Sequence, residues 1–210
     1  MAYKIKEIYY TLQGEGFHAG RPAVFCRFAG CNLWTGREED RENAVCRFCD
    51  TDFWGTDGIE GGKYELEELI HKLRSTWKGH GEQKIFVVFT GGEPALQLDQ
   101  KLVDACHREN MEIAVETNGT ILLPDGIDWV TVSPKAHTEI LMTKGDELKL
   151  VHPQKDIQPE MFESLDFTHF YLQPMDNQNR NENTRKCIDF CLDNPSWKLS
   201  IQTHKYIGIA

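Results

Sequence analysis

The sequence predicts an α/β fold built on a parallel sheet, and three observations support this class. Short apolar runs rich in Val, Ile and Phe recur along the 210 residues, and each is followed at once by polar or glycine residues. Helical patterns with a period near 3.6 residues lie between several of the runs. Hydrophobic residues make up 40% of the chain, which is enough for one globular core. Strands that alternate with helices and are buried on both faces indicate a parallel sheet.

Seven apolar runs are the expected strands, and three amphipathic segments are the expected helices. A complete eight-stranded α/β barrel takes about 250 residues. We therefore expect residues 1–210 to form one domain, a partial, trimmed (β/α)6-type TIM-like barrel. Ligands of such folds bind at the carboxyl ends of the strands, so one site is expected there. The expected strands are 23–28, 85–89, 113–115, 129–132, 148–151, 170–172 and 199–201, and the expected helices are 64–77, 98–110 and 181–192.

Charge and composition restrict the partners of the chain. Its 23 basic and 33 acidic residues give a formal net charge of −10. No nucleic-acid partner is expected, because such binding depends mainly on Lys and Arg neutralising phosphates. No apolar run reaches the ~20 residues of a membrane span, and the N-terminus lacks the apolar stretch of a signal peptide. We therefore expect a cytoplasmic protein with no membrane partner, whose thiols stay reduced.

Three of the seven cysteines form a motif after the first expected strand. Cys31, Cys46 and Cys49 have the spacing C-x14-C-x2-C, and thiolates select iron–sulfur clusters, zinc or copper(I). Three cysteines can hold three irons of a [4Fe–4S] cluster and leave the fourth iron open, whereas fully protein-bound clusters use four. A structural zinc site needs four ligands, so Cys26, His18 or another residue would have to complete it. Buried, unrelated thiols are a further alternative.

A second motif, Thr90-Gly-Gly-Glu-Pro94, directly follows the second expected strand. Two glycines let a backbone approach a ligand closely, and Glu93 adds a carboxylate. A tight strand-to-helix turn, with Pro94 at the start of the next element, explains the same residues equally well. The four cysteines outside the first motif are expected in the core: Cys26, Cys106, Cys187 and Cys191.

Taken together, the two motifs resemble the radical S-adenosylmethionine (SAM) superfamily. That resemblance implies a reduced [4Fe–4S] cluster whose open iron chelates SAM, and a 5′-deoxyadenosyl radical that abstracts hydrogen from the substrate. The usual superfamily spacing is C-x3-C-x2-C, and the 14-residue gap departs from it. Three further stretches make the chain similar, over nearly its full length, to the 7-carboxy-7-deazaguanine synthase family, which includes members with an expanded cluster loop. They are residues 10–16 (YTLQGEG), 25–34 (FCRFAGCNLW) and 49–52 (CDTD).

The resemblance implies a specific reaction and its cofactors. A radical SAM lyase of this family converts 6-carboxy-5,6,7,8-tetrahydropterin to 7-carboxy-7-deazaguanine with release of ammonia, on the route to queuosine and other 7-deazapurines. SAM is regenerated, Mg²⁺ assists, an electron donor such as flavodoxin reduces the cluster, and the enzyme is a homodimer. Two alternatives stay open: a glycyl-radical activating enzyme, which consumes SAM, and a non-catalytic zinc-binding module.

The resemblance also implies roles for individual residues. The cluster ligands are Cys31, Cys46 and Cys49, and Thr51 binds Mg²⁺. Substrate contacts are implied for Leu12, Gln13, Gly14, Arg27, Thr90 and Ala210. Cofactor contacts are implied for Phe48, Cys49, Asp50, Gly92, Ser133, Pro134, Lys135, Gln173, Pro174, Met175 and Asp176.

Several of these residues have ordinary structural explanations. Arg27 lies among apolar neighbours, where a charge is costly unless paired, so it either binds the substrate carboxylate or forms an internal ion pair. The apolar C-terminus either folds over the site or frays. From the residues alone, Asp50 or Asp52 would be a more usual Mg²⁺ ligand than Thr51. Glu116 and His204 are further candidates.

Overall fold

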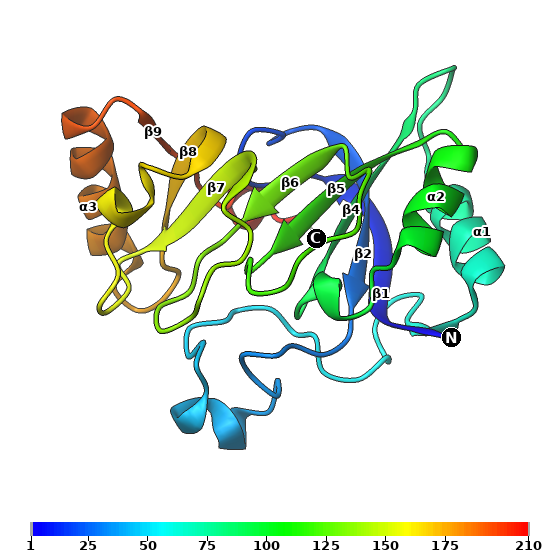
Figure 1. The fold of residues 1–210 in the computed structure, drawn as a ribbon, viewed down its shortest axis with the longest axis horizontal. Helices are drawn as coiled ribbons and strands as arrows, with labels where there is room; N and C mark the ends of the chain where they lie inside the picture. The colour runs from blue at the N-terminus through cyan, green and yellow to red at the C-terminus, as the bar shows by residue number, and fades with distance from the viewer. Residues whose placement is uncertain (1, 210) are drawn as a thin grey trace.

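A nine-stranded sheet forms the centre of the computed structural model, which describes residues 2–209 (Figure 1). The strand order is β3-β1-β2-β4-β5-β6-β7-β8-β9. From β2 through β4 to β9 all neighbours are parallel, whereas β1 is antiparallel to both β2 and β3. The strands are β1 (Tyr3–Leu12), β2 (Pro22–Phe28), β3 (Gly62–Tyr64), β4 (Ile85–Gly91), β5 (Met111–Thr117), β6 (Trp129–Val132), β7 (Lys144–His152), β8 (Asp166–Pro174) and β9 (Trp197–Leu199).

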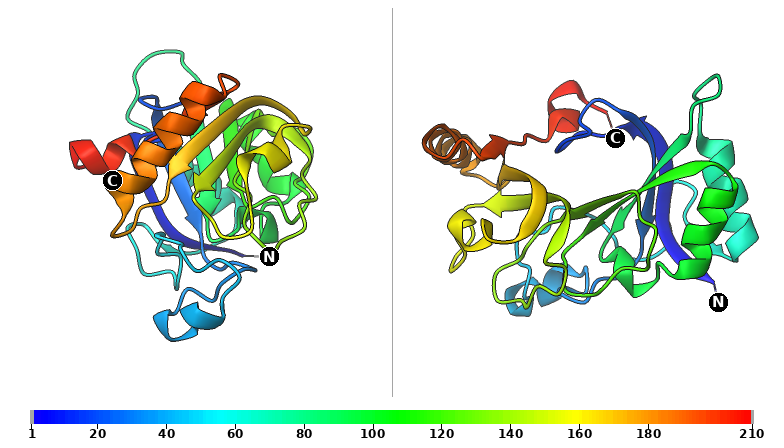
Figure 2. Two further views of the ribbon diagram at one scale, coloured as in Figure 1. Left: turned by 90° about the vertical axis from the view of Figure 1, so that its left-hand side faces the viewer. Right: turned by 45° about the horizontal axis from the view of Figure 1, so that its top comes forward.

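The sheet curves strongly but does not close, because β3 and β9 stand at its two ends (Figure 2). The expected partial barrel is therefore confirmed, and six of the seven expected strands form as β2 and β4 to β8. The seventh, expected at 199–201, lies earlier in the chain, because β9 ends at Leu199. The expected helices form too, with the short α4 beyond the last strand. They are α1 (Leu66–Thr76), α2 (Gln100–Arg108), α3 (Arg180–Asp193) and α4 (Thr203–Ile207).

The barrel is trimmed at two of its crossovers. Within the described residues, no helix connects β5 to β6 or β6 to β7. The connecting segments, 118–128 and 133–143, lack the apolar repeat of an amphipathic helix. The first contains Gly119, Pro124 and Gly126, and the second contains Pro134. No helix of the described chain has the length and apolar character needed to cross a membrane.

Strand β1 is the main element that the sequence pattern did not reveal. It buries Tyr3, Ile5 and Ile8, and its pairing with β2 shifts register between Ile5 and Glu7. Such a bulge puts an extra residue into the strand and interrupts its alternation of buried and exposed positions. The period-2 signal of a strand is therefore broken in the middle of β1.

Helices cover the outer face of the sheet at both ends. Helices α1 and α2 pack against the strands from β1 to β5, and α3 packs against β8 and β9 (Figure 1). The cysteines expected in the core lie in two hydrophobic clusters: Cys26 and Cys106 in the cluster under α1 and α2, and Cys187 with the adjoining Cys191 in the cluster under α3.

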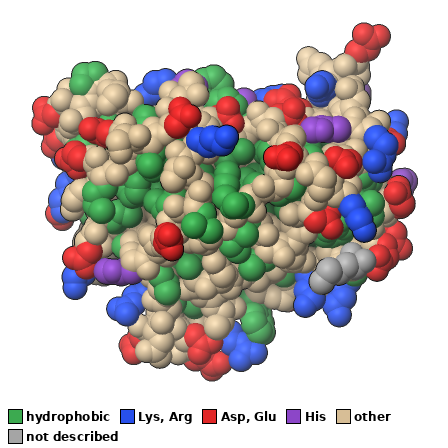
Figure 3. Space-filling model, in the orientation of Figure 1, with side chains coloured by type: hydrophobic (Ala, Val, Ile, Leu, Met, Phe, Trp, Pro, Cys, Tyr) green, Lys and Arg blue, Asp and Glu red, His purple; other side chains and the backbone are tan. Residues whose placement is uncertain are grey.

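In the orientation of Figure 1, apolar side chains lie across the middle of the surface, and charged side chains lie mostly toward its rim (Figure 3).

Candidate active site

A pocket of about 370 Å³ opens at the carboxyl ends of the parallel strands. Of the 20 residues to which the resemblance assigns a role, 18 line it, and they come from segments spread over the whole chain. Pro134 does not line it, and its carbonyl oxygen instead accepts a hydrogen bond from Gln154 Nε2 at 3.2 Å. The 18 are Leu12, Gln13, Gly14, Arg27, Cys31, Cys46, Phe48, Cys49, Asp50, Thr51, Thr90, Gly92, Ser133, Lys135, Gln173, Pro174, Met175 and Asp176.

The three motif cysteines lie on one wall of this pocket, on the loop that leaves β2 and projects from the sheet (Figure 1). The hydrogen bond from Cys46 lowers the pKa of Cys49 to about 6, although burial opposes the shift. The same hydrogen bond and burial raise the pKa of Cys46. Burial raises the pKa of Cys31, although the backbone N–H of Leu33 donates to its Sγ at 3.4 Å. Neutral pH therefore favours a thiolate at Cys49, the form that binds metal.

The donor set fits a cluster bound by three cysteines. Cys26 is fully buried in the core, and His18 packs against Phe86 and Trp129, so neither proposed fourth zinc ligand reaches the pocket. Across residues 2–209, no group of three or more His, Cys, Asp or Glu side chains is arranged to hold a single metal ion. Three soft thiolates without a fourth cysteine match a [4Fe–4S] cluster that keeps one iron free of protein.

Gly92 brings the second motif against the cysteine loop. A Cβ atom at this position would lie 2.0 Å from the carbonyl oxygen of Gly30 and 3.0 Å from Cys31 Cβ. No residue with a side chain fits there without moving the backbone. The glycine thus lets the end of β4 lie directly against the first cysteine.

Glu93 has a structural role in the same motif. Its side chain is fully buried and accepts hydrogen bonds from Thr117 Oγ1 at 2.6 Å and from the backbone N–H of Asn118 at 2.8 Å. It also accepts the N–H of Ala95 at 3.0 Å and so caps the short turn that begins at Pro94. The strand-to-helix turn therefore accounts for Glu93, while the start of the motif lines the pocket.

Arg27 forms an ion pair inside the pocket. Its Nε donates to Glu7 Oε1 at 2.7 Å, and its Nη2 donates to the Tyr9 hydroxyl at 3.0 Å. These bonds use two of the five N–H donors of the guanidinium. The ion pair expected as the alternative therefore exists, and it also fixes the position of an arginine that lines the cavity.

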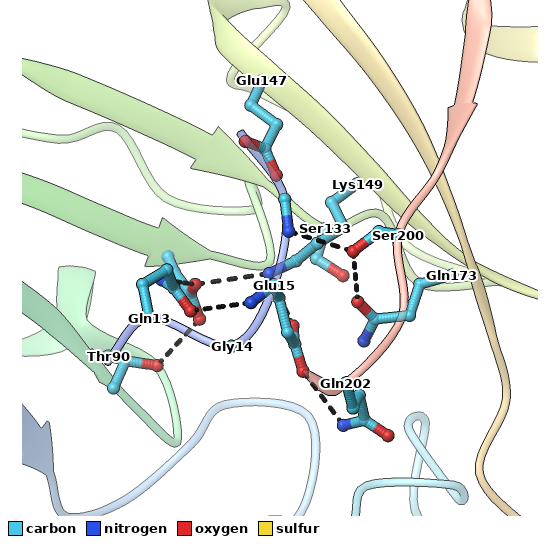
Figure 4. A network of polar contacts seen from close by, with 12 residues as sticks. Gln13, Gly14, Glu15, Thr90, Ser133, Glu147, Lys149, Gln173, Ser200 and Gln202 are labelled. Carbon is cyan, nitrogen blue, oxygen red and sulfur yellow. Dashed lines mark hydrogen bonds and ion pairs between the residues drawn. The ribbon is translucent and has the colours of Figure 1, made fainter. Parts of the chain in front are cut away.

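A buried charge network forms the opposite part of the pocket (Figure 4). Lys149 Nζ lies 2.7 Å from Glu15 Oε2 and 3.3 Å from Glu116 Oε1. Gln13 Nε2 donates to Glu116 Oε1 at 3.0 Å, and Gln202 Nε2 donates to Glu15 Oε1 at 3.0 Å. Four elements thus contribute to one connected set of charged and amide groups.

Lys149 is a pocket residue that the sequence pattern did not reveal. The run 148–151 predicts an ordinary buried strand, and β7 does bury Leu148 and Leu150. Glu147 and Lys149 alternate with these leucines, so two charged side chains point to the opposite, inner face of the sheet. Charged residues at alternate positions of a strand buried on both faces were the signal that could have identified them.

Five of the expected cofactor residues form two contact groups. Lys135 Nζ donates to Ser133 Oγ at 2.7 Å and lies 6.0 Å from the centre of the Phe48 ring. Burial lowers the pKa of Lys135. Asp50 and Asp176 form the second group, since Lys205 Nζ binds their carboxylates at 2.7 Å and 2.6 Å. Each group joins the cysteine loop to later parts of the chain.

The C-terminal segment folds back to the pocket. Thr203 donates to the carbonyl oxygen of Gly14 through its N–H at 2.9 Å and through its hydroxyl at 2.7 Å. A Cβ atom on Gly14 would lie 2.1 Å from His204 Nδ1, so the glycine makes room for that ring. Ala210 itself lies outside the described residues.

Comparison with known proteins identifies the family of the chain. No family model matches it. The chain is 57% identical to the 7-carboxy-7-deazaguanine synthase of Bradyrhizobium diazoefficiens over 210 residues, with both chains covered completely. It is equally similar to the enzyme of that name from Burkholderia multivorans, at 57% identity over the whole of both chains. The chain belongs to the 7-carboxy-7-deazaguanine synthase family.

Structural comparison agrees with this assignment. The crystal structure of QueE from Escherichia coli matches with a TM-score of 0.75 at 29% identity, covering 97% of this chain and 95% of that one. The resemblance to the 7-carboxy-7-deazaguanine synthase family and the partial-barrel fold are both confirmed, and so is the expected class of radical SAM enzyme.

Proposed function

We propose that this chain converts 6-carboxy-5,6,7,8-tetrahydropterin to 7-carboxy-7-deazaguanine with release of ammonia, as a radical SAM lyase of 7-deazapurine and queuosine biosynthesis. One observation carries the proposal beyond the family name. A single pocket combines a three-cysteine wall with an arginine and a buried set of carboxylates and amides. The cysteines suit a radical-generating cluster, and the polar groups suit a ring that carries both hydrogen-bond donors and a carboxylate.

Each part of the pocket has a role in this proposal. A [4Fe–4S] cluster on Cys31, Cys46 and Cys49 supplies, when bound, the electron for reductive cleavage of SAM. Arg27, held by Glu7, binds the substrate carboxylate through its remaining donors. The pterin ring is held by Leu12, Gln13, Gly14, Glu15 and Thr90, and SAM by Phe48, Asp50, Gly92, Ser133, Lys135, Gln173, Pro174, Met175 and Asp176.

The finer assignments belong to the same proposal. Thr51 lines the pocket beside the cysteine loop and is the proposed Mg²⁺ ligand, with substrate oxygens completing a site that needs few protein groups. Flavodoxin is the proposed type of reductant. The protein is proposed to be a cytoplasmic homodimer with its one domain spanning 1–210, and Ala210 is proposed to contact the substrate.

Product formation tests the proposal. The protein is reconstituted anaerobically with iron and sulfide, reduced, and incubated with SAM, Mg²⁺ and 6-carboxy-5,6,7,8-tetrahydropterin. We expect 7-carboxy-7-deazaguanine and ammonia in equal amounts, detected by mass spectrometry and an ammonia assay. A cluster-loaded protein that forms neither product contradicts the proposed reaction. A colourless protein that binds one zinc and no sulfide contradicts the cluster assignment as well.

A further inference from the structure

The buried lysine of β7 supports an inference that deepens the proposed function and rests on it. Lys149 is only 4% exposed, and an ammonium group at such a position requires charged partners. Its partners are Glu15, from the loop between β1 and β2, and Glu116, from β5. The Lys149 ammonium group therefore sets the distance between the carboxylates of Glu15 and Glu116, which are 101 residues apart in the sequence.

Both carboxylates have a second partner that fixes their orientation. An amide N–H of Gln202 donates to Glu15, and an amide N–H of Gln13 donates to Glu116. Figure 4 shows Gln13, Glu15, Lys149 and Gln202 around the same space, and all of them line the pocket together with Glu116. The carboxylates are thus held in place before any ligand binds.

Lys149 also controls the charge of this network. Burial would raise the pKa of Glu15, but the charge and hydrogen bond of Lys149 and the hydrogen bond of Gln202 lower it to about 2. The charge of His204, on α4, acts in the same direction. Glu15 is therefore ionised throughout the neutral range and accepts hydrogen bonds without donating any.

Two more charged groups face the lysine. Glu147, on β7 itself, accepts the backbone N–H of Phe17 at 2.9 Å, and burial raises its pKa. Lys135, beyond β6, is close enough for Lys149 to help lower its pKa, after burial as the main cause. Glu147 does not line the pocket, so the carboxylates paired with Lys149 that a ligand can meet are Glu15 and Glu116.

We propose that Lys149 is a positioning residue that fixes the carboxylates of Glu15 and Glu116, so that the pocket selects rings with adjacent N–H donors, such as the amino-pyrimidinone edge of a pterin. Ionised carboxylates offer only acceptors. A ring that presents an oxygen in place of the amino group would leave a buried anion without its hydrogen bond, which weakens binding.

Two stable ligands test this selectivity without any turnover. 6-Carboxypterin carries the amino group, and 6-carboxylumazine has an oxygen in its place, while both carry the same carboxylate. Each is titrated calorimetrically into the reconstituted protein from about pH 5 to about pH 8. We expect the wild type to prefer the pterin by roughly ten- to hundredfold, with a preference that changes little over this range.

Substitution of the lysine should change both results. In Lys149→Met, Glu15 keeps its burial but loses the cation, so its pKa rises and the carboxyl takes up a proton as the pH falls. Affinity for the pterin should then fall by up to about tenfold per pH unit below the new pKa, and the preference over the lumazine should shrink. Lys149→Arg keeps the cation and should keep the wild-type profile. His204 is present in every variant, so comparing the profiles cancels its contribution.

Controls separate this role from a structural one. Lys198→Met removes an ammonium near the Tyr171 ring, away from the pocket, and should leave both ligand affinities unchanged. SAM affinity and the melting temperature report whether Lys149→Met is folded. If it is not, Glu15→Gln replaces it, because a neutral amide in that position should abolish the preference.

The outcomes separate a failure of the proposed function from a failure of the proposed role of Lys149. A wild type that binds neither pteridine and forms no product contradicts the proposed function. A wild type that binds 6-carboxypterin, with folded Lys149→Met showing the same affinity, preference and pH profile, overturns the role of Lys149 alone. Glu15→Gln with undiminished preference for the pterin overturns it too.

Discussion

The two ends of the pocket are held together in different ways. At the cysteine end, the loop has a small core of its own, in which the Trp34 and Phe53 rings meet edge to face at 5.4 Å and Arg41 lies over Trp34 at 4.0 Å. At the charged end, Lys149 joins side chains from distant strands and loops. A locally packed loop can change in length without disturbing the sheet. A network shared by several elements can change only if its partners change as well.

Removal of a cysteine should have the largest effect, because the cysteine end of the pocket can then no longer hold its cluster. We expect Cys49→Ala to lose bound iron and all product formation, since two thiolates cannot hold the cluster. Binding of 6-carboxypterin should be reduced far less, because the Lys149 ion pairs lie outside the loop, which joins this network through the hydrogen bond from Gln202 Nε2 to Asp50 Oδ2 at 3.2 Å. Iron content and calorimetric titration measure the two properties on the same sample.

Cys191→Ala is the matched control, since that thiol lies on α3 away from the pocket. It should retain its iron and its activity. A Cys49→Ala protein with normal activity would refute the cluster assignment.

The next largest effect is expected at Arg27. Charge-assisted hydrogen bonds contribute about 1.5–3 kcal/mol, so Arg27→Met should raise the KM for the carboxy-tetrahydropterin by roughly ten- to hundredfold. SAM affinity should change little. Steady-state kinetics with either ligand varied provide the measurement.

Arg21→Met offers a close control for this change. Arg21 also forms an ion pair, with Glu112 at 2.6 Å, but does not line the pocket. Its KM should stay near the wild-type value. Equal KM increases in both variants would show that the loss of an ion pair, rather than of a substrate contact, is responsible.

The smallest effect is expected from a substitution in the core of the cysteine loop. It tests whether the loop is stabilised by its own packing, independently of the sheet. Trp34→Ala removes a side chain that is 7% exposed. The loop should open on its own, so iron should be lost to a chelator several times faster while the urea midpoint of the sheet changes little. Phe89→Ala, in the core of β4, is the comparison and should lower the free energy of unfolding by about 3–5 kcal/mol. Equal shifts of the urea midpoint in both variants would mean that loop and sheet unfold as one unit.

The same contrast explains what could be predicted from the sequence. The cysteine end follows from residues close together in the chain, because Cys46 and Cys49 lie three positions apart on one loop and Gly92 follows a clear strand signal. The charged end was predicted only in part. Gln13 belongs to a recognisable motif, but Lys149 acquires its role from Glu15 and Glu116, and only the curvature of the sheet brings these together.

Strand β1 and Pro134 illustrate the same limit. A bulge hid the strand because it disrupts a purely local pattern. Pro134 shares its predicted cofactor role with its motif neighbours Ser133 and Lys135, but unlike them it does not line the pocket, and its carbonyl oxygen accepts a hydrogen bond from Gln154. Motifs predict which segments meet at a site, whereas packing decides which side chains of a segment face it.

The ratio of product formed to SAM consumed tests the central claim most directly. The account holds that one pocket uses SAM as a regenerated cofactor for a reaction on a bound pterin. Reduced, reconstituted protein supplied with excess 6-carboxy-5,6,7,8-tetrahydropterin and limiting SAM should form many molecules of 7-carboxy-7-deazaguanine per SAM, with SAM recovered intact. One SAM cleaved for every product molecule, or cleaved without any product, would contradict the account and favour an enzyme that consumes SAM to activate a partner.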